Sequence, residues 1–245
     1  MRRLRFLTSR HRAPSTNRVL GLLLAFNAGA VNAGGFLVLH MYTSHMTGFA
    51  SQLADGLVLG NTRLLLNALG AVLAFTSGAA VCAVLVNWGR RRQMQSEYAS
   101  PLFLEAALLA CFGIMGRRFE EHHWLLVSAT VGLLCFTMGL QNAIITKISQ
   151  KEIRTTHVTG MVTDIGIELG RLIYWNRGTH PGKEEVRADR DNLWLLTSLV
   201  GLFVIGGITG AIGFEYAGFV VTLPLAAILL VLAVVPVADD LRKIW

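Results

Sequence analysis

The sequence predicts an all-α polytopic membrane protein with six transmembrane helices, arranged as two inverted three-helix repeats that each contain a short broken or re-entrant half-helix. Composition indicates the class, because 53% of the 245 residues are hydrophobic and only 15% are charged. Long apolar runs indicate the crossings, since about 20 helical residues cover about 30 Å of hydrocarbon. A repeated polar motif indicates the two repeats.

The motif reads Thr-Ser-His-Met-Thr-Gly at residues 43–48 and returns as Thr-Thr-His-Val-Thr-Gly at residues 155–160. In the apolar runs before the two copies, Gly-Ala-Val-Asn-Ala at 29–33 is matched by Gly-Leu-Gln-Asn-Ala at 139–143. Asn32 precedes His45 by 13 residues, and Asn142 precedes His157 by 15, so the register slips by two. Two matched pairs in the same order nevertheless indicate a duplication.

The first repeat covers about residues 19–118 and follows a basic cytoplasmic tail, residues 1–18, that carries six arginines and no acid. Its predicted crossings are residues 19–39, 64–88 and 101–116. Residues 48–60 could form a helix of about 18 Å at about 1.5 Å per residue, which is too short to cross alone. Pro101 opens the third crossing at a first-turn position that proline tolerates.

The second repeat covers about residues 124–237, so residues 19–237 form a single membrane domain, and residues 238–245 form a second cytoplasmic tail. Its predicted crossings are residues 124–145, 193–213 and 218–237, the last two joined by a tight link at 214–217. Residues 161–175 are predicted to form a short helix. In it, Asp164 and Glu168 could balance the charge of Arg171, or all three residues could simply lie on a solvent-exposed face. The polar loop 176–192 has no assigned role.

The distribution of basic residues predicts the orientation. If the two short segments do not cross, one side of the membrane holds 19 of the 22 Lys and Arg residues. The excess of Lys and Arg in cytoplasmic loops then predicts a multi-pass protein of the bacterial inner (plasma) membrane with both termini in the cytoplasm. Three crossings per repeat is an odd number, so the second repeat is inverted relative to the first, as in many transporters.

The motif residues form the candidate substrate site. Helix N-termini carry a partial positive charge and uncommitted N–H groups, which suit an anionic or carboxylate-bearing ligand. His45 and His157 could bind this ligand or carry a proton, with Asn32 and Asn142 as polar partners. The predicted substrate-binding residues are Asn32, Ser44, His45, Thr47, Gly48, Asn142, Thr156, His157, Thr159, Gly160 and Asp164.

A structural interpretation of the same motif is equally open. Hydroxyl residues at the start of a short helix cap its free N–H groups, so Thr47 and Thr159 could be helix caps. The two histidines could then be buried hydrogen-bonding groups. Non-helical backbone at membrane depth has to be buried in protein or to line a cavity, and both interpretations satisfy this requirement.

The sequence indicates no catalytic residue, metal site or cofactor. Cys82, Cys111 and Cys135 lie inside apolar runs without a CxxC pair, and His40, His45 and His157 have no HExxH or carboxylate cluster to support a metal or haem site. No GxSxG nucleophile motif is present. The basic residues lie beside apolar runs, so we expect the lipid bilayer and a small solute or ion as partners, and no nucleic acid. A homo-oligomer is compatible with the sequence.

At residues 44–48, 139–143 and 154–160 the chain resembles the YoaK-like family of small bacterial inner-membrane proteins, a domain of unknown function. The likeness covers roughly residues 19–237, and it implies a six-helix inner-membrane protein without a settled activity. Two positions depart from the family pattern, which usually has Asp where this chain has Asn32 and Asn where it has Phe49. A proton-coupled role that depends on an acid at position 32 therefore does not carry over.

The sequence thus predicts a secondary transporter or channel-like permease for a small anionic solute, bound between two half-helix N-termini at the repeat interface. The alternative is a non-transporting membrane protein that binds a partner or lipid through the same buried polar core. Neither function is enzymatic. Solute flux that depends on both motif histidines distinguishes the first from the second.

Overall fold

The computed structural model describes residues 14–94, 96–119, 125–149, 155–174 and 185–244, and in these ranges all regular structure is helical. Most of the predicted basic tail 1–18 and of the predicted loop 176–192 lies outside them. The helices are α2 (Pro14–Leu39), α3 (Met46–Val58), α4 (Thr62–Arg91), α5 (Ala99–Phe119), α6 (Leu125–Ile148), α7 (Val158–Ile173), α8 (Arg190–Ala217), the 3-10 helix η1 (Gly218–Val221) and α9 (Thr222–Ile244). The all-helical prediction is confirmed for the described residues.

Four stretches of the described chain are long and apolar enough to cross a membrane: Thr16–Leu37, Thr62–Arg91, Ala129–Ile148 and Arg190–Val234. The fourth has 45 residues and runs from α8 through η1 into α9. Ala99–Ile114, within α5, is a shorter apolar helix. These lengths and compositions indicate a helical membrane protein.

The predicted link at residues 214–217 is wrong, because these residues continue α8 to Ala217. The break comes at Gly218, which has a positive φ of 58° that glycine adopts without steric cost. The chain then makes the short 3-10 helix η1 before α9 begins. The turn between the last two long helices is therefore set by one glycine and not by the polar side chains before it.

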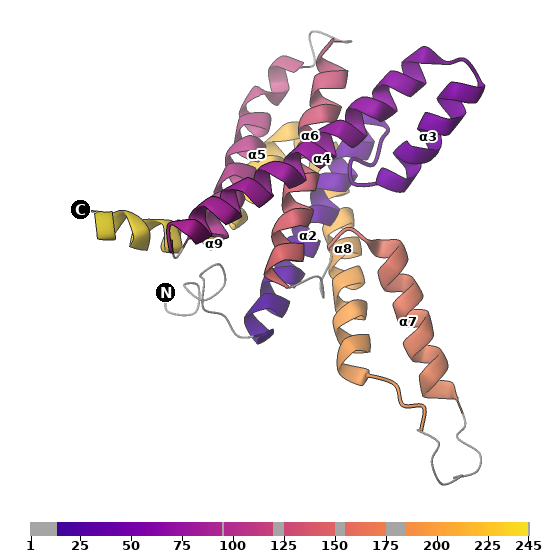
Figure 1. Cartoon of the computed structure of the whole chain (residues 1–245). Coiled ribbons are helices and arrows are strands. Elements are labelled where there is room, and N and C mark those ends of the chain that lie inside the picture. Colours follow the sequence, from indigo (N-terminus) through magenta and orange to yellow (C-terminus); the bar gives the residue numbers. More distant parts are fainter. Residues whose placement is uncertain (1–13, 95, 120–124, 150–154, 175–184, 245) are drawn as a thin grey trace.

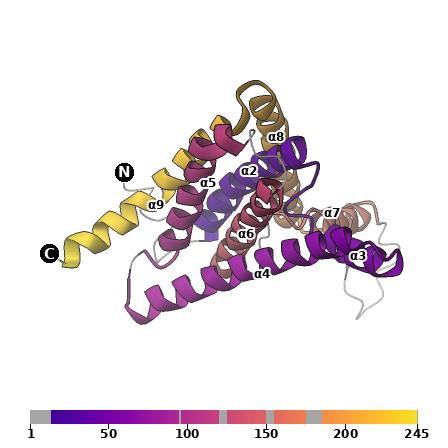
Figure 2. The same cartoon turned by 90° about the horizontal axis from the view of Figure 1, so that it is seen from above.

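The long helices pack in three pairs: α2 against α8, α4 against α6, and α5 against α9. Each pair joins a helix from residues 14–119 to one from residues 125–244, so the two parts of the chain interlock. The short helix α3 packs on α4, and α7 packs on α8. Both short helices begin near the middle of the molecule and run outward toward opposite ends (Figure 1). Seen from above, α5 and α9 lie on the other side of the molecule from α3 and α7 (Figure 2).

Glycines allow α2 and α8 to approach closely. A Cβ built at Gly29 would lie 2.0 Å from the carbonyl oxygen of Phe203, and a Cβ built at Gly206 would lie 2.0 Å from the carbonyl oxygen of Phe26. The contact is reciprocal, since the glycine of each helix faces the carbonyl of a phenylalanine three residues before the other glycine. Any side chain at either glycine would push the two backbones apart.

The pair α4 and α6 repeats this contact in detail. A Cβ at Gly78 would lie 2.0 Å from the carbonyl oxygen of Phe136, and a Cβ at Gly139 would lie 2.0 Å from that of Phe75. All four helices therefore carry a Phe-x-x-Gly sequence, at residues 26–29, 75–78, 136–139 and 203–206. The α2–α8 contact and the α4–α6 contact therefore use the same residue types at the same spacing.

The starts of α4 and α8 match as well. Asn61 caps α4 by accepting a hydrogen bond from the backbone N–H of Leu64 at 3.1 Å. Asp189 caps α8 in the same way, accepting from the backbone N–H of Asn192 at 3.0 Å. Each cap lies 17 residues before the glycine of its helix crossing. The caps satisfy N–H groups that would otherwise lack a partner in the first turn.

Candidate functional site

A cavity of about 810 Å³ lies where the two copies of the motif meet. Its lining includes matching residues from both copies, from the helices that precede them, and from the helix crossings: Asn32, Tyr42, Ser44, His45, Met46, Thr47, Phe75, Asn142, Thr146, Thr156, His157, Val158, Thr159 and Phe203. No carboxylate, lysine or arginine is among these described lining residues. The nitrogen-bearing side chains of this lining are those of the two histidines and the two asparagines.

Asn32 and Asn142 hold the two copies of the motif in place. The Oδ1 atom of Asn32 accepts hydrogen bonds from the backbone N–H of Ser44 at 3.2 Å and from its hydroxyl at 3.0 Å. The Nδ2 atom of Asn142 donates to Oγ1 of Thr156. All three hydrogen bonds join a long helix to the residue directly before a motif histidine. The second copy therefore has two more residues between its asparagine and its histidine, but the asparagine contacts the equivalent motif residue in both copies.

The motif histidines are the N-caps of the short helices. His45 (φ −87°, ψ 68°) precedes α3 and His157 (φ −85°, ψ 53°) precedes α7, and neither side chain makes a capping hydrogen bond. The interpretation of Thr47 and Thr159 as caps is wrong, because each is the second residue of its helix. A cap has to stand before the first helical residue to reach the free N–H groups of the first turn. Both helices thus begin at the cavity without a side-chain cap from their N-cap residue.

The histidine side chains are exposed, so the interpretation of them as buried hydrogen-bonding groups is wrong. Gly48 and Gly160 do not line the cavity of the motifs, but they make room for the two imidazoles. A Cβ built at Gly48 would lie 2.9 Å from Nδ1 of His45, and one built at Gly160 would lie 2.3 Å from Nδ1 of His157. Each ring lies over the first turn of its helix because the third helical residue has no side chain.

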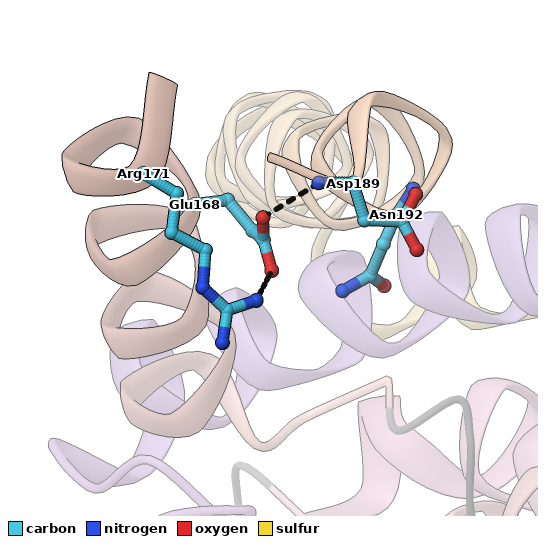
Figure 3. A network of polar contacts seen from close by, with 4 residues as sticks. All are labelled: Glu168, Arg171, Asp189 and Asn192. Carbon is cyan, nitrogen blue, oxygen red and sulfur yellow. Dashed lines mark hydrogen bonds and ion pairs between the residues drawn. The ribbon is translucent and has the colours of Figure 1, made fainter. Parts of the chain in front are cut away.

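Asp164 is exposed on α7 and does not line the cavity. Glu168, one turn further along α7, is buried and pairs with Arg171 through a 2.7 Å contact. The other oxygen of Glu168 accepts the backbone N–H of Asp189 at 2.8 Å, as Figure 3 shows. Glu168 therefore forms an ion pair with Arg171 and links α7 to the start of α8 through a hydrogen bond.

Sequence reasoning missed several lining residues. Thr146 lies one turn after Asn142, and its hydroxyl donates to the Asn142 carbonyl at 2.7 Å. Phe75 and Phe203 belong to the Phe-x-x-Gly sequences of α4 and α8. The recurrence of that sequence in four apolar runs is a signal that would have singled out both phenylalanines, although it does not show which helices face each other.

Long apolar helices, together with a cavity lined by both copies of the polar motif, define a helical membrane protein with a candidate ligand site. A family model described as "Protein of unknown function (DUF1275)" matches residues 20–235, and the chain belongs to this family. Membership of a family of unknown function was predicted for nearly the same residues, while the match does not carry the narrower YoaK-like name. Neither the curated proteins nor the solved structures give a significant match to the chain.

Proposed function

We propose that this protein is a secondary transporter or channel-like permease for a small anionic solute, which binds between the N-termini of α3 and α7. The observation that carries the proposal is the cavity of about 810 Å³ that both copies of the motif line together. Two helix N-termini supply N–H donors and positive potential, the two histidines supply further hydrogen-bonding nitrogens, and no acidic side chain of the described lining opposes an anion.

We also propose that α2, α4, α5, α6, α8 and α9 are six crossings in two inverted repeats, with α3 and α7 as re-entrant half-helices. The two matched Phe-x-x-Gly crossings and the two matched asparagine contacts support this arrangement. The opposite directions of α3 and α7 support it too (Figure 1). Transporters built in this way bind substrate at the repeat interface and rock one repeat against the other around the site.

With the excess of Lys and Arg on one side, the proposed location is the bacterial inner membrane with both termini in the cytoplasm. The site binds and releases its solute without chemical change, so the proposed function is not enzymatic. Lipid and solute are its partners, and a homo-oligomer remains compatible with the proposal.

The inverted arrangement is tested by cysteine labelling. Leu59, at the outer end of α3, and Ile173, at the outer end of α7, are 73% and 79% exposed. Single cysteines at these positions, in a background without Cys82, Cys111 and Cys135, should react with a membrane-impermeant maleimide from opposite sides. Reaction of both from the same side would refute the inverted repeats.

Transport is tested by flux in proteoliposomes with a panel of formate, acetate, nitrate, sulfate and phosphate. We expect flux of at least one anion by the wild type and loss of it in the double variant His45→Ala, His157→Ala. Asp55→Asn, exposed on α3 and outside the cavity, is the matched control and should keep the flux. A folded wild type with neither flux nor an anion-induced thermal shift would favour the alternative, a non-transporting protein that binds a partner or lipid through this core.

A further inference from the structure

Glu105 of α5 is a buried carboxyl group that the proposed site does not use. Its exposed fraction is 1%, and its Oε2 atom has no hydrogen-bond partner. Within the described ranges Glu105 forms no ion pair, which separates it from the other buried glutamates of those ranges: Glu97 pairs with Arg90 at 3.7 Å and Glu168 with Arg171 at 2.7 Å. An ionisable group inside a membrane-spanning helix is a candidate for an ion or proton pathway.

The surroundings of Glu105 favour the neutral acid. Its neighbours along α5, Leu102, Ala106 and Leu109, are buried and apolar. The part of α9 whose side chains are described, residues 222–234 and 237–238, has no titratable group, and neither has η1. An isolated carboxylate in such surroundings is strongly unfavourable, so the group either holds a proton or finds a cation.

One thiol lies within electrostatic reach of both Glu105 and a cation. Cys82 of α4, a fully buried residue, interacts with Glu105 and with Lys147 in the last turn of α6. Lys147 is half-buried and makes no ion pair in the described chain, with Glu105 or with any other residue. The same thiol is therefore an electrostatic neighbour of the carboxyl group and of the ammonium group, which form no ion pair with each other in the described chain.

The helix α6 connects this cluster to the cavity. Asn142 and Thr146 line the cavity, and Lys147 is the next residue of the same helix. Because Asn142 and Lys147 belong to the same helix, any shift of α6 on ligand binding would also move the ammonium group relative to Glu105. The cation can then take the place of the proton as the partner of the carboxylate.

We propose that Glu105 is a proton-binding site that couples proton movement to occupancy of the central cavity; the coupling rests on the proposed transport function. In the present arrangement the carboxyl group holds the proton. When α6 shifts, the O–H bond breaks, the proton passes to water, and the carboxylate pairs with the Lys147 ammonium group. No electron is transferred, and the proton returns when the ion pair separates.

The proton site is tested without any solute, by infrared spectra of the protein in lipid nanodiscs at acidic, neutral and alkaline pH. The wild type should show the C=O band of a protonated carboxyl group at neutral pH, and Glu105→Gln should lack it. Glu97→Gln is the matched control, since that buried acid has an arginine partner, and should keep the band. The S–H band of Cys82 should change at the pH at which the C=O band disappears. Superimposable spectra of wild type and Glu105→Gln at neutral pH would overturn the proton site.

Coupling is tested in proteoliposomes that contain a pH-sensitive dye, with the same five anions. Each anion that the wild type transports should carry protons, whereas Glu105→Gln should move the anion with proton movement reduced to background. Unchanged proton movement in Glu105→Gln would overturn the coupling. If no anion moves at all, the proposed function and the coupling fail together, while the infrared bands decide the proton site separately.

Discussion

Replacing Gly139 of α6 by alanine is expected to destabilise the protein much more than the same change at Gly132, seven residues earlier on the same helix. A Cβ at position 139 would lie 2.0 Å from the carbonyl oxygen of Phe75, whereas a Cβ at position 132 meets nothing within 4 Å. Since real Cβ contacts stay beyond 3.0 Å, α4 and α6 have to separate locally by at least about 1 Å. The opposing atom belongs to the backbone and cannot turn away.

The magnitude follows from two opposing terms. Alanine is the better helix former by about 1 kcal/mol, and this gain applies at both positions. It therefore cancels when the two variants are compared, and the difference between them reports the crowding alone. Overpacking of a closely packed contact costs about 1–3 kcal/mol, occasionally more, so this range is expected for the difference in the free energy of unfolding.

The assay is reversible unfolding in mixed micelles, with the free energy of unfolding compared between Gly139→Ala and Gly132→Ala. Because the crossing is reciprocal, adding Gly78→Ala to Gly139→Ala should cost less than the sum of the two single changes, since the helices are already separated. On α8, Gly206 and Gly201 offer the same comparison, as Gly206 faces a carbonyl at 2.0 Å and Gly201 has open space. If the free energy of unfolding is the same for Gly139→Ala as for Gly132→Ala, and for Gly206→Ala as for Gly201→Ala, the close backbone contacts of α4 with α6 and of α2 with α8 are refuted.

Two further changes test the site and its support. Gly160→Ala should weaken anion binding and leave the fold intact, because the new Cβ displaces only the His157 ring, 2.3 Å away; an unchanged imidazole NMR signal would contradict this. Glu168→Ala should lower the free energy of unfolding by about 1–3 kcal/mol, since the buried carboxylate accepts a backbone N–H and pairs with an arginine. Arg187→Ala is the control: its side chain is 82% exposed, so removing that ion pair should change stability by less than about 1 kcal/mol, and equal losses in thermal unfolding would count against the role of Glu168.

The helices were predictable because hydrocarbon length and helix rise fix how many apolar residues a crossing needs. Each predicted crossing and both short segments coincide with helices in the described ranges, apart from the link at 214–217. The convergence of the two motifs on one cavity was also predictable, since duplicated segments that meet at an interface bring equivalent residues together. Neither the asparagine contacts nor the reciprocal crossings could be derived, because both depend on which helix faces which.

The helix caps show where local sequence rules fail. Threonine before a short helix is a good capping residue, so Thr47 and Thr159 fitted the rule. The helices start earlier, at Met46 and Val158, and a histidine stands at each N-cap position instead. A glycine three residues later provides room for the ring. Residues that leave a helix start without a side-chain cap are expected at a ligand site, where the ligand can take the free N–H groups.

The hairpin of α3 and α4 and the hairpin of α7 and α8 differ at one matching position. This difference bears on how the proposed transporter works. Gly56 and Glu168 each lie 11 residues after a motif histidine. A Cβ at Gly56 would lie 2.9 Å from the backbone nitrogen of Leu65, so α3 lies directly on α4. In the other hairpin the carboxylate of Glu168 holds the start of α8, and an open groove of about 580 Å³, lined by Leu169, Leu193 and neighbouring residues, runs beside the contact between α7 and α8.

The close backbone contact between α3 and α4 has to be broken before these helices can separate. The helices α7 and α8, in contrast, can bend relative to each other about the hydrogen bond that Glu168 accepts at the start of α8. Rocking motion should therefore fall mainly on α7 and α8, with α3 and α4 as the more rigid partner. Inverted repeats with equal hairpins would open to either side at similar free energy. In the proposed transporter the two openings should therefore differ in free energy, because the Glu168 contacts belong to α7 and α8 and Gly56 has no carboxylate to replace them.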